Sequence, residues 1–156
     1  MNIKQLIKKT IQETGHQPFL FVGSGLSKRY LNTEKWDEYA DFRCENREEL
    51  QHNVSALKIA IAKHFSDIQI DDTNTEIALF KQLGKRSISG IITTNYDEML
   101  EKTFPYFEIY VGQEELIFAN IAGIGEIYKI HGSVTDASSL VLTSKDYSDF
   151  EERSYL

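Results

Sequence analysis

Apolar and polar residues alternate along the chain in blocks that predict helices and strands in turn. Between Ile3 and Ile11 the apolar residues recur at helical spacing with lysine and glutamine between them, which predicts an amphipathic helix that ends at Gly15. The run Phe19-Leu20-Phe21-Val22 is continuously apolar and too short for a helix. Such a run is typical of a parallel strand that is covered on both faces.

The later blocks continue this alternation. The pattern predicts helices within 36–65, at 77–83 and at 98–103, and a last helix that Thr143 or Ser144 caps and that runs through Tyr147 and Phe150. It predicts further strands at 88–92, 106–111, 126–130 and 140–142.

Strands that alternate with helices favour an α/β fold with an open parallel sheet. We expect a Rossmann-like three-layer fold with a mostly parallel sheet, helices on both faces, and a helical insertion at about 32–84, after the turn that follows the first strand. No repeat or Ser/Gly/Pro-rich linker divides the sequence, so 1–156 is expected to form a single domain.

Composition and charge narrow the class of protein. The chain has 156 residues, of which 41% are hydrophobic and 26% charged, as expected of one folded globular domain. Cys44 is its one cysteine, which excludes an internal disulfide and a zinc site built from several thiolates, and favours a reducing compartment. The first residues resemble neither a signal peptide nor a membrane span, so we expect a cytoplasmic protein with no membrane partner. A net charge of -7 disfavours direct nucleic-acid binding.

Candidate chemistry follows the strands, because ligands bind at the carboxyl ends of parallel strands. The first such segment is Gly23-Ser24-Gly25-Leu26-Ser27, the glycine loop, with Lys28 and Arg29 next to it. Glycines permit a sharp turn and close approach of a ligand, and N–H groups at a helix start can bind a diphosphate. Taken alone, the segment fits an ordinary tight turn equally well.

Two more segments follow apolar strands. Thr93-Thr94-Asn95-Tyr96-Asp97 can simply cap a helix through Asn95 or Asp97. In Lys129-Ile130-His131-Gly132-Ser133 the histidine can be an ordinary polar residue at a sheet edge. Its imidazole can also exchange a proton near neutral pH, and the glycine leaves space beside it for a substrate.

The three segments in this order resemble the sirtuin family, in which a glycine loop, a Thr-x-Asn-x-Asp motif and a His-Gly motif line one NAD pocket. The segment 140–147, Leu-Val-Leu-Thr-Ser-Lys-Asp-Tyr, is similar to the bacterial sirtuin-like branch found in antiphage defence proteins. The resemblance spans Phe19 to Tyr147. It implies cofactor-binding positions at Gly23, Ser24, Gly25, Leu26, Ser27, Thr94, Asn95, Asp97 and His131.

The resemblance also implies a function and roles. Asn95 would orient the nicotinamide ribose and the attacking group, Asp97 would contact the carboxamide, and His131 would be the base. Cleavage of the nicotinamide–ribose bond passes through an oxocarbenium-like cation, so it needs a fixed polar group near the ribose and a base for the nucleophile. The expected activity is hydrolysis of NAD+, as substrate, to nicotinamide and ADP-ribose, in antiphage defence by NAD depletion.

The sequence departs from the family in three places. Protein-deacylating sirtuins carry a zinc ribbon with two cysteine pairs, so the single Cys44 makes NAD-dependent deacylation less favoured and no zinc is expected. The stretch from Ser27 to Thr93 is shorter than the usual insertion, and the chain ends before a second loop that binds the adenosine half of NAD. We therefore expect an incomplete domain, with a homo-oligomer, a partner chain or a C-terminal sensor region covering the exposed sheet edge. A noncatalytic module that binds NAD or ADP-ribose, and a pure assembly domain, remain alternatives.

Aromatic residues provide a last set of candidates. Phe104, Tyr106, Phe107 and Tyr110 could line a nicotinamide pocket, but their strand-like spacing favours packing in the core. Trp36 is also interpreted as a packing anchor.

Overall fold

A four-stranded parallel sheet forms the centre of the protein. The structure is a computed structural model and describes residues 2–46, 52–71, 73–113, 115 and 124–153. The strands are β1 (Phe19–Val22), β2 (Gly90–Thr93), β3 (Glu108–Val111) and β4 (Glu126–Lys129). Their order in the sheet is β1-β2-β4-β3, and each neighbouring pair is parallel.

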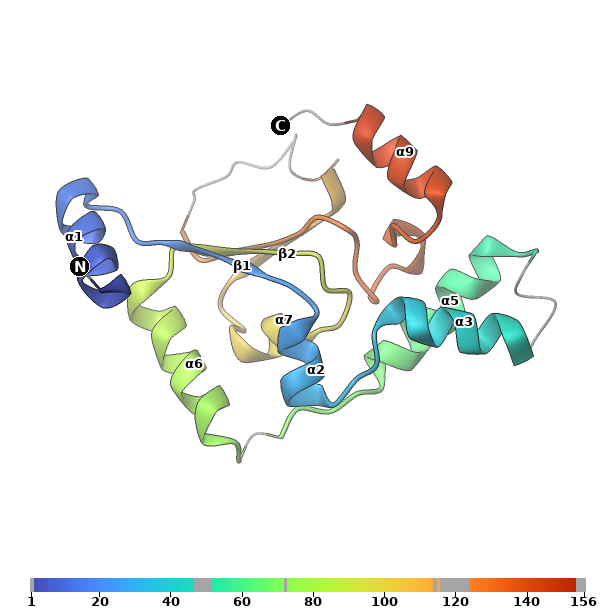
Figure 1. Ribbon diagram of the computed structural model, residues 1–156, viewed down its shortest axis with the longest axis horizontal. Helices are drawn as coiled ribbons and strands as arrows, with labels where there is room; N and C mark the ends of the chain where they lie inside the picture. The colour runs from blue at the N-terminus through green and yellow to red at the C-terminus, as the bar shows by residue number, and fades with distance from the viewer. Residues whose placement is uncertain (1, 47–51, 72, 114, 116–123, 154–156) are drawn as a thin grey trace.

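Helices connect and cover these strands (Figure 1). They are α1 (Ile3–Thr14), α2 (Gly25–Leu31), α3 (Trp36–Asn46), α5 (Val54–Ser66), α6 (Thr75–Ser87), α7 (Met99–Thr103), α9 (Ser144–Glu152) and the 3-10 helix η1 (Ala137–Ser139). In Figure 1, α6 and α7 lie on one side of the strands and α9 on the other. The predicted Rossmann-like α/β class, with helices after the glycine loop, is confirmed.

Local signals set several helix ends as the sequence predicts. Gly15 ends α1 in the left-handed conformation, with a φ of 69°, and its N–H donates to Ile11 O. The alternative between Thr143 and Ser144 is resolved in favour of Thr143, whose side chain accepts from the Asp146 N–H at the start of α9.

The register aligns the ends of three strands. Val22 of β1 pairs with Thr93 of β2, and Thr93 pairs with Lys129, the last residue of β4. All three strands therefore end on one rung of the sheet. The segments that follow these strands therefore begin side by side at the carboxyl edge of the sheet, where a ligand site is expected.

Two apolar clusters support this edge. The first lies against the face of the sheet that carries Val22, Ile91 and Ile127, where Phe104 from the end of α7 packs. The second lies beyond the carboxyl ends of the strands, where Ile61 and other α5 side chains pack with residues that the later loops contribute. This second cluster forms the floor beneath the candidate site.

Strand β1 is less covered than its apolar run suggests. Phe19 is 42% exposed and Phe21 73% exposed, so the prediction of a strand covered on both faces is wrong. Successive side chains point to opposite faces of a sheet. Val22 and Leu20 pack in the first cluster, whereas Phe19 and Phe21 point to the other face, at an edge strand that pairs only with β2 among the described residues.

The predicted strand at 140–142 is also wrong. Residues 140–142 do not form a strand, and Leu140 and Leu142 are buried in the second cluster. Two hydrogen bonds to different residues hold the backbone there: Val141 N–H donates to His131 O at 3.0 Å, and Val141 O accepts from the Tyr96 hydroxyl at 2.7 Å. The alternating burial arises from packing on α5 and not from strand pairing.

The aromatic residues after α7 confirm the core interpretation, with one exception. Phe104, Phe107 and Tyr110 are buried, and the Phe104 ring packs against Phe107 and Phe80 with centroids 5.2 and 5.0 Å apart. Tyr106 is 52% exposed.

We expect Phe104→Ala to lower the free energy of unfolding by about 3–5 kcal/mol, because it removes a fully buried ring and leaves a cavity. Tyr106→Ala, which removes a half-exposed ring, is the matched control and should lower it by no more than about 1 kcal/mol. Urea denaturation followed by circular dichroism measures both. Equal losses in the two variants would contradict this description of the core.

Candidate functional site

One cavity of about 310 Å³ opens at the carboxyl ends of the strands, near the lower end of the range of about 300–1,000 Å³ for small-molecule pockets. It is lined by residues from all three segments that the sequence singles out. These are Ser24 and Ser27 after β1, Thr94, Asn95 and Asp97 after β2, and His131 after β4. The shared strand ends therefore bring the amide of Asn95 and the imidazole of His131 to one hollow.

A chain of buried hydrogen bonds fixes the side chain of Asn95. Its Nδ2 donates to Gly23 O at 3.2 Å and to Ser27 Oγ at 2.8 Å. Ser27 Oγ in turn donates to Asp97 Oδ2 at 2.6 Å. Because the Gly23 carbonyl can only accept, the nitrogen of the Asn95 amide must face it, and the orientation of the amide is determined.

This orientation leaves one buried acceptor without a partner. Asn95 is 7% exposed, and no donor from the described residues reaches its Oδ1. Buried polar atoms are nearly always paired, because an unpaired one loses its hydrogen bonds to water. Since Asn95 lines the cavity, a hydroxyl group of a bound ligand can supply the missing donor.

The local backbone and two aromatic rings place His131. The rings of Tyr147 and Phe150 in α9 meet it edge-on, with centroids 5.6 and 5.1 Å away. Burial lowers the pKa of His131, which favours the neutral imidazole, the form that can accept a proton. Gly132 has a φ of 93°, and a Cβ there would lie 2.3 Å from Ser139 O, so only glycine fits after the histidine.

The glycines of the first loop have a different explanation. Neither Gly23 nor Gly25 has a positive φ, and a Cβ on either would meet no described atom within 4 Å. Neither backbone strain nor packing within the described residues therefore requires glycine at these positions, and the close approach of a ligand expected from the sequence stays a prediction. Leu26 packs against the first apolar cluster and does not line the cavity.

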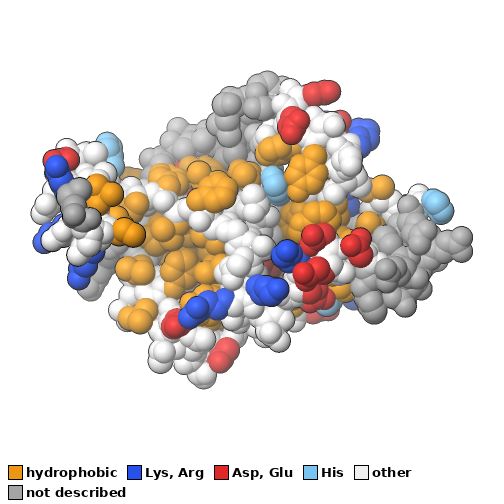
Figure 2. All heavy atoms as spheres, viewed as in Figure 1, with side chains coloured by type: hydrophobic (Ala, Val, Ile, Leu, Met, Phe, Trp, Pro, Cys, Tyr) orange, Lys and Arg blue, Asp and Glu red, His pale blue; other side chains and the backbone are white. Residues whose placement is uncertain are grey.

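Charges around the cavity are mixed. Lys28 and Lys35 line it together with Glu34, Asp37 and Asp97, and Figure 2 shows blue and red side chains next to each other across the middle of this face. The lining therefore has no excess of positive charge to attract a diphosphate.

Asp97 combines two roles that the sequence left as alternatives. Its Oδ1 accepts the Met99 N–H at 3.0 Å at the start of α7, while its Oδ2 accepts from Ser27. Helix capping and a place in the cavity are thus compatible.

The sequence did not identify the aromatic wall of the cavity as a unit. Trp36, Phe65, Tyr96 and Tyr147 line it, and the rings of Trp36 and Tyr96 are 6.1 Å apart. Burial, followed by Tyr147 and nearby carboxylates, raises the pKa of Tyr96, so its hydroxyl stays protonated. Tyr96 and Tyr147 belong to segments that the sequence singled out, but these four residues come from distant parts of the chain, and no local pattern indicated that they share one cavity.

An ion pair anchors α9, the helix that covers His131. Asp146 accepts from Lys58 Nζ at 2.8 Å, and from the N–H groups of Thr143 and Leu142 at 2.8 and 3.1 Å. Burial alone would raise the pKa of Asp146, but these hydrogen bonds lower it to about 2. Helix α9 is therefore tied to α5 beneath the cavity.

Neither a cluster of metal-binding side chains nor a membrane-spanning helix is found in the described part of the chain. Within the described ranges, no three His, Cys, Asp or Glu side chains are grouped as a metal site would need. No helix in the same part of the chain has the length and apolar character to cross a membrane.

Comparisons with known proteins support the resemblance seen in the sequence. The family model of the SIR2-like domain matches residues 89–156, which include Asn95, Asp97 and His131 but not the glycine loop. The chain is 33% identical over 97 residues to the NAD(+) hydrolase ThsA of Enterococcus faecium, a match that covers 58% of this chain and 20% of that protein. The sirtuin-like resemblance is thereby confirmed, and the chain spans about a fifth of the length of this relative.

We expect the stability of the protein to depend on Asp146 at acid pH. Because its pKa is lowered in the folded state, its contribution is complete above the unfolded value near 4 and is lost as the pH falls toward about 2. Asp146→Asn should abolish this pH-dependent part of the free energy of unfolding, which amounts to about 1–2 kcal/mol. Urea unfolding measured from pH 5 to pH 2 tests it. If the variant and the wild type lose stability in parallel over this range, the anchoring role of Asp146 is contradicted.

Proposed function

We propose that this protein binds NAD+ as a substrate and hydrolyses the bond between nicotinamide and ribose, giving nicotinamide and ADP-ribose. One observation carries the proposal: Asn95, whose buried Oδ1 has no partner among the described residues, and His131, whose pKa burial lowers, line one cavity. A ribose supplies hydroxyl donors, and hydrolysis needs a base. The name of the similar protein, an NAD(+) hydrolase, agrees with this chemistry.

In this proposal the reaction is a substitution at C1′ of the nicotinamide ribose. The C1′–N bond breaks and its electron pair leaves with nicotinamide, while a water oxygen forms the new bond to C1′. His131 accepts the proton that the water loses and releases it to solvent. Asn95 Oδ1 accepts from a ribose hydroxyl and fixes the sugar as positive charge develops on it.

The remaining site residues bind the substrate in this proposal. Both Asp97 oxygens already accept one hydrogen bond, but each carboxylate oxygen can accept another, so Asp97 can receive the carboxamide N–H of nicotinamide. The open space over Gly23 and Gly25 leaves room for the diphosphate to approach the backbone. Ser24, Ser27 and Thr94 contact the adjoining ribose.

The biological setting belongs to the same proposal and comes from the resemblance. Residues 1–156 would form a single sirtuin-like NAD-binding domain of a cytoplasmic bacterial protein. It would act in antiphage defence by depleting NAD, as a homo-oligomer or together with a further sensor region or partner. The partly exposed face of β1, which includes Phe21, supports a covering partner.

A second candidate function is a noncatalytic module that binds NAD or ADP-ribose as a signal. The small cavity and its mixed charge favour it, because they suit one half of a dinucleotide better than the whole molecule. The two functions differ in turnover, so one experiment separates them.

We expect purified full-length protein to release nicotinamide and ADP-ribose from NAD+, and Asn95→Ala and His131→Ala each to reduce this turnover by at least about 10²-fold. Chromatography of the products measures the rate, and a thermal-shift titration with ADP-ribose shows whether each variant still folds and binds. The surface variant Tyr106→Ala is the control. Turnover that persists in both variants would remove the assignment, and binding without turnover in the wild type would establish the noncatalytic module.

The pH dependence should identify the base. Because burial lowers the pKa of His131 below 6.5, kcat/KM should fall on the acidic side with an apparent pKa below 6.5. Activity is lost toward low pH because a general base works only in its neutral form, and protonation removes that form. A rate that stays constant below pH 5, or one that is already lost at pH 7.5, would be incompatible with His131 as the base.

A further inference from the structure

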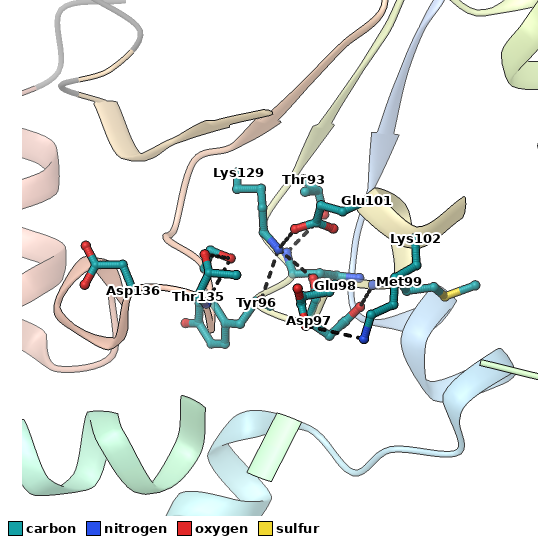
Figure 3. Close-up of polar contacts among 12 residues, drawn as sticks. Thr93, Tyr96, Asp97, Glu98, Met99, Glu101, Lys102, Lys129, Thr135 and Asp136 are labelled. Carbon is teal, nitrogen blue, oxygen red and sulfur yellow. Dashed lines mark hydrogen bonds and ion pairs between the residues drawn. The ribbon is translucent and has the colours of Figure 1, made fainter. Parts of the chain in front are cut away.

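Behind the cavity lies a buried cation that the proposed mechanism does not use. Lys129, the last residue of β4, is 1% exposed. Its Nζ donates to Tyr96 O at 3.1 Å and to Asp97 O at 2.6 Å, and it pairs with the Glu101 carboxylate of α7. Figure 3 shows the side chain reaching from β4 to the loop after β2. An ammonium has three N–H donors, and these three partners use all of them.

The two carbonyls are not arbitrary acceptors. They belong to the peptide groups immediately before and after Cα of Asp97, so Lys129 fixes the backbone on both sides of that residue. The side chain of Asp97 accepts from Ser27, which accepts from the Asn95 amide. The position of the Asn95 amide therefore depends on a series of hydrogen bonds that begins at Lys129 Nζ.

Lys129 also ends the strand that leads into the segment of the proposed base. His131 follows it by two residues, and Ile130 N–H donates to Thr93 O at 3.0 Å across the same sheet edge. One side chain thus connects the segment of His131 to the loop of Asn95. Arginine could not replace it easily, because a planar guanidinium directs its donors differently from a compact ammonium.

Fold stability alone does not explain a lysine here. Burying an ion pair removes both charges from water, and well-packed apolar residues of similar volume are often as stabilising or more so. What the lysine supplies, and an apolar residue cannot, is a set of bonds to two particular carbonyl groups.

We propose that Lys129 is a positioning residue that sets the placement of Asn95 relative to His131 for cleavage of the nicotinamide–ribose bond. The inference rests on the proposed function for its kinetic consequence. Its structural consequence, a fixed loop at 94–97, does not depend on any activity.

The test compares three variants of the full-length protein. Lys129→Met combined with Glu101→Gln removes the cation and leaves no unpaired buried carboxylate, so this double variant avoids the folding failure expected of Lys129→Met alone. Glu101→Gln by itself keeps the cation and both carbonyl bonds, at some loss of stability. Phe80→Leu, in the first apolar cluster, controls for a general loss of stability.

We expect the double variant to lower kcat by about 10²-fold with a much smaller change in KM, because a small misplacement of a reacting group has effects of this size. The apparent pKa on the acidic side should not move, since burial, and not Lys129, sets it. Glu101→Gln should retain most of the activity although it is less stable, and Phe80→Leu should retain its kcat. A wild-type kcat in the double variant, or losses that simply follow stability across the three variants, would overturn the proposal.

Amide hydrogen exchange provides the second measurement. The Asn95 N–H donates to Thr93 Oγ1 and the Met99 N–H to Asp97 Oδ1, both at 3.0 Å. In the double variant these two amides should exchange faster, while those inside β2 stay protected. If the wild type shows no NAD turnover, the proposed function fails, and this measurement decides the inference alone: faster exchange at these two amides with β2 still protected supports it, and unchanged exchange overturns it.

Discussion

Three parallel strands that end on one rung of the sheet create the central constraint of this structure. Val22, Thr93 and Lys129 are register partners, so three loops begin side by side, and their polar groups must find partners in a small space. Thr93 connects the first two loops, because its hydroxyl donates to Val22 O at 2.9 Å and accepts the Asn95 N–H. Lys129 connects the loop after β2 to the end of β4. The loops are therefore parts of one hydrogen-bonded unit.

That unit satisfies most of its own polar groups, and Asn95 Oδ1 is the exception on which the proposed function rests. Asn95 lines the cavity, uses both amide hydrogens within the protein, and leaves its buried oxygen unpaired among the described residues. Folding gains nothing from an unpaired buried acceptor, whereas a ligand hydroxyl would pair with it. Side chains of α3, α5 and α9 line the same cavity, and burial there lowers the pKa of His131. A substrate that brings hydroxyl donors and needs a base fits such a site.

Much of the fold and of the site could be predicted because the signals are local. Each motif directly follows an apolar run, and the order of the runs gives the parallel α/β class. The errors arose where packing between distant segments decides: Phe21 is apolar but exposed at an edge strand, and Leu140 and Leu142 alternate because they pack on α5. Lys129 belongs to one of the motifs that the sequence singled out, yet its role was missed. The sequence does not show that a lysine is buried or that its ammonium makes three hydrogen bonds. The apolar strand around it was the one available signal.

The central claim is that Asn95 and His131 act on the same ribose. A crystal structure of the His131→Ala variant with NAD+ bound tests it most directly. The account predicts the nicotinamide ribose inside this cavity, with a hydroxyl about 3 Å from Asn95 Oδ1 and C1′ facing the space left by the imidazole. A dinucleotide bound elsewhere, or with its nicotinamide ribose turned away from both residues, would contradict the account.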